Sequence, residues 1–146
     1  MRYKHFGNAD VDVSELAVGT WAIGGDNYGP VDREASIEAI RRMIDNGVNL
    51  VDTAPCYGNG YSEKVVGEAL AGGYRDKVLV SSKVGLVTSV NGYDRDSSFK
   101  NIMREVESSL YNLKTDHIDF YFVHWPDMNT PVSYTHLRAH ETLRHL

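Results

Sequence analysis

The sequence predicts an α/β fold with a parallel sheet, and three observations carry that prediction. Four short apolar runs, rich in β-branched and aromatic residues and bounded by turn residues, start roughly thirty to forty residues apart. Amphipathic helical patterns fill the intervals between these runs. Strands that alternate with helices in this way run parallel and are joined by right-handed crossovers. The alternation fits both an open doubly wound sheet and part of a closed barrel.

The predicted strands lie at residues 16–20, 48–52, 78–82 and 118–123. Each run has the length and the residue types of a buried strand. Residues 1–13 precede them and predict a small hairpin that turns at Gly7-Asn8. The expected order is therefore a hairpin followed by four parallel strands with three intervening helices.

The first two helices are predicted from capping residues and apolar spacing. Asp32 is a good N-cap for a helix over 33–46, and Gly47 follows where a helix end favours glycine. Ser62 is expected to open the second helix, which the glycine pair 72–73 closes.

The third helix has the most regular pattern in the chain. Ser97 or Ser98 opens it, and apolar residues then recur at steps of three and four from Phe99 to Leu113. Ahead of it, the charged residues 94–96 are interpreted as a solvated loop.

Composition excludes several classes of protein. The 146 residues are 42% hydrophobic and 24% charged, with one cysteine and a formal net charge of −5. No apolar run approaches the ~18–20 residues of a membrane span, and the first residues lack the apolar core of a signal peptide. A single cysteine cannot form an internal disulfide. An acidic net charge does not provide the positively charged surface that binds nucleic acid. We therefore expect a cytoplasmic protein with neither a membrane nor a nucleic-acid partner.

Chemistry-bearing residues follow each predicted strand. Parallel α/β proteins place their sites at the carboxyl ends of the strands, so these residues are expected to meet at one rim. In strand order they are Gly19-Thr20-Trp21, then Asp52 and Tyr57, then Lys83, and last His124-Trp125.

This set of side chains suits the reduction of a carbonyl group. A free tyrosine hydroxyl, with a pKa of about 10, is a poor proton donor near neutrality, but a neighbouring ammonium stabilises its phenolate. An aspartate can hold that lysine charged and in place, and a histidine can donate a hydrogen bond to the substrate oxygen. Such a relay needs no metal and no nucleophile. The hydride must then come from a cofactor.

Four separate segments resemble the aldo-keto reductase superfamily in the family's order and spacing. They are the signature-like residues 47–63 (GVNLVDTAPCYGNGYSE), the Gly19-Thr20-Trp21 run, Ser81-Ser82-Lys83-Val84, and Asp119 with His124-Trp125-Pro126-Asp127. The resemblance covers about residues 3–131. Members of this family are (β/α)₈ barrels that reduce aldehydes and ketones with NADPH, less often with NADH. The resemblance implies that this chain holds the first four strands and three helices of such a barrel, preceded by the hairpin.

Carried over residue by residue, the resemblance assigns roles to the residues at the strand ends. It makes Tyr57 the general acid and Lys83 the cation that assists it. Asp52 anchors Lys83, and His124 orients the carbonyl. The implied cofactor contacts are Gly19, Thr20, Trp21 and Asp52, and the implied substrate contacts are Trp21, Tyr57, His124 and Trp125.

Alternatives remain at this point. Taken singly, Asp52 could be a turn former, Lys83 and Tyr57 ordinary loop residues, and His124 structural. A non-catalytic nicotinamide-binding regulatory or channel-associated subunit on the same fold is the second hypothesis, and a flavodoxin-like domain is a weaker third. The four residues together favour the enzyme, because a pure scaffold has no physical need for all of them. A nucleophilic Cys56 is not favoured, because its loop offers no adjacent base.

The length raises a further expectation, since a closed (β/α)₈ barrel typically needs ~250 residues. Residues 1–131 are expected to be the amino-terminal half of a barrel. Residues 132–146 hold three of the six histidines and break the strand–helix rhythm, so they are interpreted as an unrelated tail from a premature junction. His136 and His140 within it could share a helix face as metal ligands, but no motif supplies a third ligand. The chain alone is then expected to have little activity and to associate through exposed strand edges.

Overall fold

The computed structural model describes residues 1–7, 9–26, 28–90 and 92–131. Its strands are β1 (Tyr3–His5), β2 (Asp12–Ser14), β3 (Val18–Gly19), β4 (Leu50–Asp52), β5 (Leu79–Val84), β6 (Leu86–Ser89), β7 (Gly92–Arg95) and β8 (Phe120–Val123). Its α-helices are α1 (Arg33–Asp45), α2 (Tyr61–Ala69) and α3 (Phe99–Leu113), and its 3₁₀ helices are η1 (Trp21–Gly24) and η2 (Arg75–Lys77).

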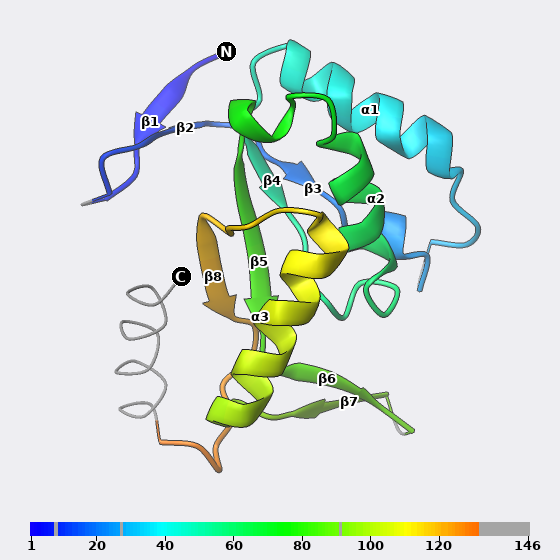
Figure 1. Cartoon of the computed structure of the whole chain (residues 1–146), viewed down its shortest axis with the longest axis vertical. Coiled ribbons are helices and arrows are strands. Elements are labelled where there is room, and N and C mark those ends of the chain that lie inside the picture. The colour runs from blue at the N-terminus through cyan, green and yellow to red at the C-terminus, as the bar shows by residue number, and fades with distance from the viewer. Residues whose placement is uncertain (8, 27, 91, 132–146) are drawn as a thin grey trace.

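A four-stranded parallel sheet forms the centre of the described chain. The strand order is β3-β4-β5-β8, and all three neighbouring pairs are parallel. Helices α1, α2 and α3 lie side by side along one face of this sheet (Figure 1). The observed architecture confirms the predicted alternation of strands and helices, and it corresponds to part of a barrel.

The helix starts at α1 and α3 agree with the capping residues. The Asp32 side chain accepts a hydrogen bond from the Ala35 amide at 2.8 Å, and Ser98 caps α3. The second helix differs from the prediction, because α2 begins at Tyr61 after Gly60. The Ser62 hydroxyl instead donates to the Thr20 carbonyl oxygen at 2.9 Å. The side chain that the sequence suggested as a helix cap is thus used in a tertiary hydrogen bond.

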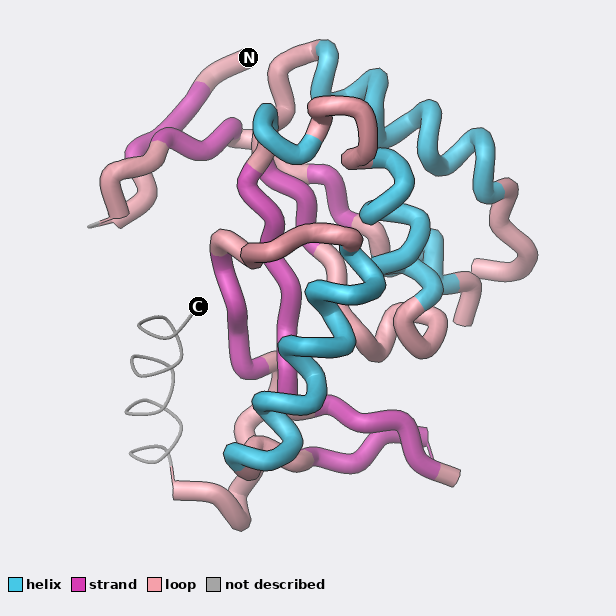
Figure 2. The backbone as a smooth tube through the Cα atoms, viewed as in Figure 1, coloured by secondary structure: helices cyan, strands magenta, loops and turns pink. Residues whose placement is uncertain are grey.

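Two antiparallel hairpins lie at opposite ends of the sheet (Figure 2). The predicted hairpin is β1–β2, at the amino ends of the parallel strands. The second, β6–β7, was not predicted, and the interpretation of 94–96 as a loop was wrong for Asp94 and Arg95, which lie in β7. Every described residue of β7 is exposed, so the strand has no alternation of apolar and polar residues for a sequence pattern to reveal.

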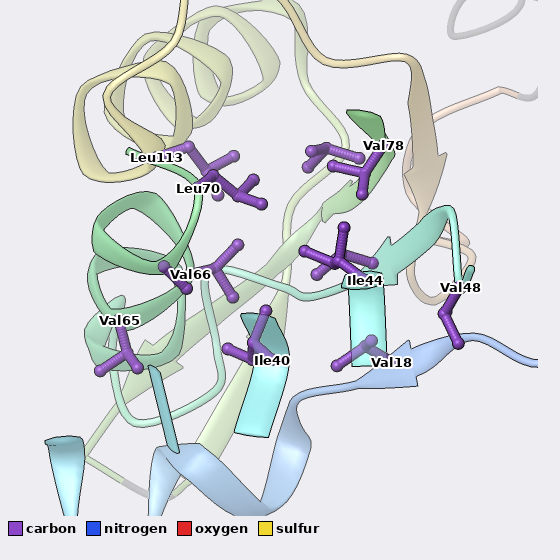
Figure 3. Packing of buried hydrophobic residues seen from close by; sticks show 12 residues of the cluster. Val18, Ile40, Ile44, Val48, Val65, Val66, Leu70, Val78 and Leu113 are labelled. Carbon is purple, nitrogen blue, oxygen red and sulfur yellow. The ribbon is translucent and has the colours of Figure 1, made fainter. Parts of the chain in front are cut away.

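The hydrophobic core lies between the helices and the sheet (Figure 3). It contains Val18, Ile40, Ile44, Val48, Val51, Val65, Val66, Ala69, Leu70, Val78, Val80 and Leu113. Helices α2 and α3 approach so closely that a Cβ on Gly67 would lie 2.6 Å from the Asn112 carbonyl oxygen. Glycine at this position is therefore required by packing.

Strands β3 and β8 are the two edges of the sheet. On β8, Phe122 and Val123 are each 45% exposed, although both belong to the most apolar strand. Within the described part of the chain, no helix is long and apolar enough to cross a membrane. The interpretations of the tail 132–146, including His136 and His140, lie outside the described residues.

We predict that the chain self-associates through the open edge at β8. Exposed edge strands with apolar side chains pair with other chains, and an edge lysine opposes such pairing. Phe122→Lys should therefore shift the chain toward monomer in sedimentation velocity at high micromolar concentration. Tyr111→Lys, on the exposed face of α3 (82% exposed), is the matched control and should leave the distribution unchanged. A strictly monomeric unmodified chain contradicts this prediction.

Candidate active site

Lys83 is the centre of the candidate site. Its ammonium nitrogen Nζ lies 2.9 Å from both carboxylate oxygens of Asp52 and 2.9 Å from the Thr53 carbonyl oxygen. The same nitrogen lies 3.3 Å from the hydroxyl of Tyr57. Neighbouring parallel strands bring these groups together, since Asp52 on β4 is in register with Ser81 on β5, two residues before Lys83. Three of the four expected catalytic residues thus form one hydrogen-bonded cluster.

Asp52 is held from several directions. Besides binding Lys83, its carboxylate accepts a hydrogen bond from the Ser81 hydroxyl at 2.9 Å. Its backbone carbonyl accepts from the hydroxyl of Thr20, also at 2.9 Å, and Thr20 is fully buried. The Thr20 side chain therefore supports Asp52 from within the protein.

The loop that carries Tyr57 is braced by backbone contacts. The Tyr57 amide donates to the Ala54 carbonyl oxygen at 3.1 Å, and the Gly58 amide donates to the Asp26 carboxylate at 2.9 Å. Gly24, the last residue of η1, lies directly against this loop: a Cβ there would approach the Gly58 nitrogen to 2.6 Å and the Tyr57 carbonyl carbon to 2.7 Å. Position 24 must be glycine for the loop to keep this place.

We predict that Gly24→Ala displaces Tyr57. The added methyl group meets the backbone of Tyr57 and Gly58, so the loop or η1 must shift, and overpacking of this kind typically costs about 1–3 kcal/mol. The expected result is the loss of the NOE between the Trp21 and Tyr57 rings, with lower thermal stability. Gly72→Ala is the control, because it places a methyl group in open space at a positive φ of 73°. It should cost stability and keep the NOE, whereas an unchanged NOE in Gly24→Ala would refute the close approach.

Two aromatic rings lie near the ring of Tyr57. The Trp21 and Tyr57 ring centroids are 6.5 Å apart, and the His124 ring stands edge-on to Tyr57 at 5.9 Å with an interplanar angle of 80°. Trp21 is 48% exposed, so its indole is available to a ligand. Trp125 follows His124, and the Arg95 guanidinium lies 5.3 Å from its ring centroid.

His124 and Cys56 form a pair that the sequence did not indicate. Cys56 Sγ lies 3.5 Å from Nδ1 of His124, which directly follows β8. The base that is missing from the Cys56 loop is therefore supplied by a residue distant in the sequence. Burial raises the pKa of the Cys56 thiol to about 11. Burial, together with the positive charge of Lys83, lowers the pKa of His124 below its ordinary value. Near neutral pH the pair is therefore a thiol and a neutral imidazole, which argues against a nucleophilic thiolate.

The Cys56 thiol is predicted to titrate far above an ordinary cysteine. Its raised pKa means that the folded protein holds the proton while an unfolded thiol, with a pKa of about 8.5, releases it. Since Cys56 is the one cysteine in the sequence, its ¹³Cβ chemical shift can be followed alone through a pH titration of the labelled chain. We expect a midpoint near pH 11. A midpoint near 8.5 in the folded chain would show that the thiol is not desolvated.

Three residues of the site were given no role from the sequence. They are Ser81, which binds Asp52; Asp26, which binds the Gly58 amide; and Tyr93, whose hydroxyl donates to the Cys56 carbonyl oxygen at 3.2 Å. Ser81 could have been found, because residues two apart in a strand share one face and Lys83 was already singled out. Asp26 and Tyr93 have no such signal, because the loop and the hairpin that carry them reach the site only through tertiary contacts. Among the described residues, no three His, Cys, Asp or Glu side chains are grouped to hold a metal ion.

Comparison with known proteins assigns the family. The model of the Aldo/keto reductase family matches residues 15–146, most of the chain. The chain belongs to this family. The aldo/keto reductase YhdN of Bacillus subtilis is 43% identical over 136 residues, which cover 92% of this chain and 41% of that protein. The NADH-specific methylglyoxal reductase of Escherichia coli is 39% identical over 150 residues, with 92% and 46% covered.

Solved aldo/keto reductase structures have the same fold as this chain. The glycerol dehydrogenase of Gluconobacter oxydans superposes with a TM-score of 0.82 at 37% identity, covering 96% of this chain and 45% of that one. An aldo-keto reductase from Klebsiella pneumoniae, crystallised in complex with NADPH, gives a TM-score of 0.75 at 33% identity, with 92% and 42% covered. A probable voltage-gated potassium channel subunit beta of rice is 34% identical over 137 residues, with 92% and 40% covered. This aldo/keto reductase chain therefore spans less than half the length of each of these relatives.

Proposed function

We propose that residues 1–131 form the proton-donating half of an NAD(P)H-dependent reductase that converts small aldehydes or ketones to alcohols. The observation that carries the proposal is the position of Lys83 Nζ, 2.9 Å from the Asp52 carboxylate and 3.3 Å from the Tyr57 hydroxyl. A cation held by a carboxylate beside a phenol is the arrangement that an acid catalyst made from tyrosine needs. We place the protein in the cytoplasm, consistent with a single cysteine.

Each residue of the cluster has a separate role in protonating the carbonyl oxygen. When bound, a reduced nicotinamide supplies the hydride to the carbonyl carbon. The Tyr57 hydroxyl gives its proton to the carbonyl oxygen, which completes the alcohol. The Lys83 ammonium stabilises the phenolate that remains, and Asp52 keeps that ammonium charged and in position. Water then returns a proton to Tyr57, while His124 donates a hydrogen bond that orients the substrate oxygen.

The residues around Tyr57 fit a flat nicotinamide ring. Trp21 offers an exposed indole beside Tyr57, and a Cβ added at Gly19 would meet nothing within 4 Å, so the backbone there is open to a ligand. We propose that Gly19 and Trp21, with Asp52, border the nicotinamide, and that Thr20, which is fully buried, serves the cofactor site by holding Asp52 from behind. One relative is named as NADH-specific, whereas two structures of a Klebsiella pneumoniae aldo/keto reductase contain NADPH or NADP, so NADPH is the first expectation and NADH the second.

The substrate pocket is proposed to include Trp21, Tyr57, His124 and Trp125. The rings of Trp21 and His124 both lie within 6.5 Å of the Tyr57 ring, centroid to centroid. Trp125 follows His124 directly and is half exposed, which leaves its indole available to a ligand at this end of β8. These walls are partly aromatic and suit a small carbonyl compound.

The test is a chimera in which residues 1–131 are joined to the carboxyl-terminal half of YhdN. We expect it to oxidise NADPH with methylglyoxal or an aromatic aldehyde and to form the alcohol in equal amount. The 146-residue chain alone is the comparison and should show little or no turnover. A folded chimera that binds NADPH and reduces no carbonyl contradicts the proposal. That outcome would favour the alternative of a nicotinamide-binding, channel-associated subunit. The similarity to the rice potassium channel subunit supports this alternative.

A further inference from the structure

Cys56 occupies a position that the proposed reaction does not use. Its side chain is buried, with 6% of the residue exposed, and its Sγ lies 3.5 Å from Nδ1 of His124. The loop around it is held on both sides, because the Tyr93 hydroxyl donates to the Cys56 carbonyl oxygen and the Gly60 amide donates to the Pro55 carbonyl oxygen. The contact between sulfur and imidazole is therefore a fixed feature of the site.

The direction of this hydrogen bond follows from the charges around it. Burial and the positive charge of Lys83 on β5 lower the pKa of His124, whereas the negative charge of Asp52 on β4 raises it. The lowering effects are larger, so the ring is neutral near pH 7. Glu105 on α3 and Asp26, on the loop after η1, oppose ionisation of the thiol, while Lys83 favours it. With burial as the largest cause, the thiol keeps its proton, and sulfur is a weak acceptor. The favoured direction is therefore from the S–H group to Nδ1.

A hydrogen bond to one ring nitrogen decides where a neutral histidine carries its proton. If Nδ1 accepts, Nε2 must hold the hydrogen. In the part of the chain that the structure describes, Nε2 of His124 has no hydrogen-bond partner, so it is free to serve a ligand. The opposite tautomer would present a lone pair from Nε2 to a carbonyl oxygen, and the two would repel.

We propose that Cys56 is a positioning residue whose thiol donates to Nδ1 of His124 and fixes the imidazole proton on Nε2, ready to be donated to the carbonyl oxygen of the substrate. The assignment rests on the proposed carbonyl reduction, because only an acceptor oxygen makes this tautomer the useful one. The hydrogen bond itself belongs to the chain without substrate. It can therefore be tested without turnover.

The test reads the tautomer of His124 directly. The full chain is labelled with ¹⁵N-histidine, and long-range ¹H–¹⁵N correlation spectra are recorded at pH 7.5, with the signals assigned by comparison with His124→Gln. We expect the Nε2–H form in the unmodified chain. Cys56→Ala removes the donor and should raise the Nδ1–H population several-fold, whereas Cys56→Ser keeps a donor and should restore the original spectrum.

Each result decides the proposal. Unchanged tautomer populations in Cys56→Ala, or an Nδ1–H form in the unmodified chain, overturn it. A shift in both variants also overturns it, since that would show a packing effect of the sulfur and not the donated hydrogen. Circular dichroism melting confirms that each variant is folded at the temperature of measurement. Failure of the chimera to reduce carbonyls would instead overturn the proposed function, and because the tautomer is read without turnover, the two failures are distinguishable.

Discussion

Tyr57→Phe in the chimera is expected to abolish carbonyl reduction while NADPH binding stays nearly intact. Phenylalanine keeps the ring that contacts Trp21 and His124 and removes only the hydroxyl beside Lys83. General acid catalysis typically contributes about 10²–10⁴-fold, so kcat should fall by that factor. The measurements are steady-state kinetics with an aromatic aldehyde and NADPH binding by fluorescence.

The matched control for that variant is Tyr61→Phe. Tyr61 begins α2 four residues away, is 37% exposed, and loses the same hydroxyl group. Its kcat should stay within about twofold of the unmodified chimera, because its hydroxyl has no part in the cluster at Lys83. Full activity in Tyr57→Phe would remove Tyr57 as the acid, and equal losses in both variants would point to damage to the fold.

Leu113→Ala is expected to cause a large loss of stability. Leu113 is 1% exposed at the end of α3, and its side chain lies beside Leu70 in Figure 3. Truncating a buried leucine to alanine typically costs about 2–5 kcal/mol, because transfer free energy is lost and a cavity remains. The backbone of α3 cannot move in to fill this cavity freely, since the carbonyl end of the helix already lies against Gly67.

Urea unfolding followed by circular dichroism measures this change in the free energy of unfolding. Tyr111→Ala is the control on the same helix, because Tyr111 is 82% exposed and its truncation should cost less than about 0.5 kcal/mol. A midpoint for Leu113→Ala that matches that of Tyr111→Ala would show that the contact between α2 and α3 does not support the fold.

Strong local patterns made most of the fold predictable. Apolar runs predicted the parallel strands β4, β5 and β8. Apolar periodicity together with good capping residues predicted the helices α1 and α3. The structure forms all of them within a few residues of the predicted bounds. The β6–β7 hairpin could not be predicted, because its exposed residues have no alternating pattern and its position depends on contacts with the Tyr57 loop.

The candidate site divides in the same way. Sequence alone singled out Asp52, Tyr57, Lys83 and His124, because parallel strands bring their carboxyl ends to one rim. The register that places Asp52 opposite Ser81, and so next to Lys83, is a property of the folded sheet.

Only the tertiary structure decided how these groups are held. The pKa of His124 depends on burial, on Lys83 and on Asp52, and the two charged residues lie on strands far from His124 in the sequence. Gly24 against the Tyr57 loop is likewise a contact between distant backbones. The physical reason is the range of the interactions. Periodicity and helix caps depend on residues a few positions apart in the sequence. Desolvation, steric contact and tertiary hydrogen bonding depend on residues that folding brings into contact.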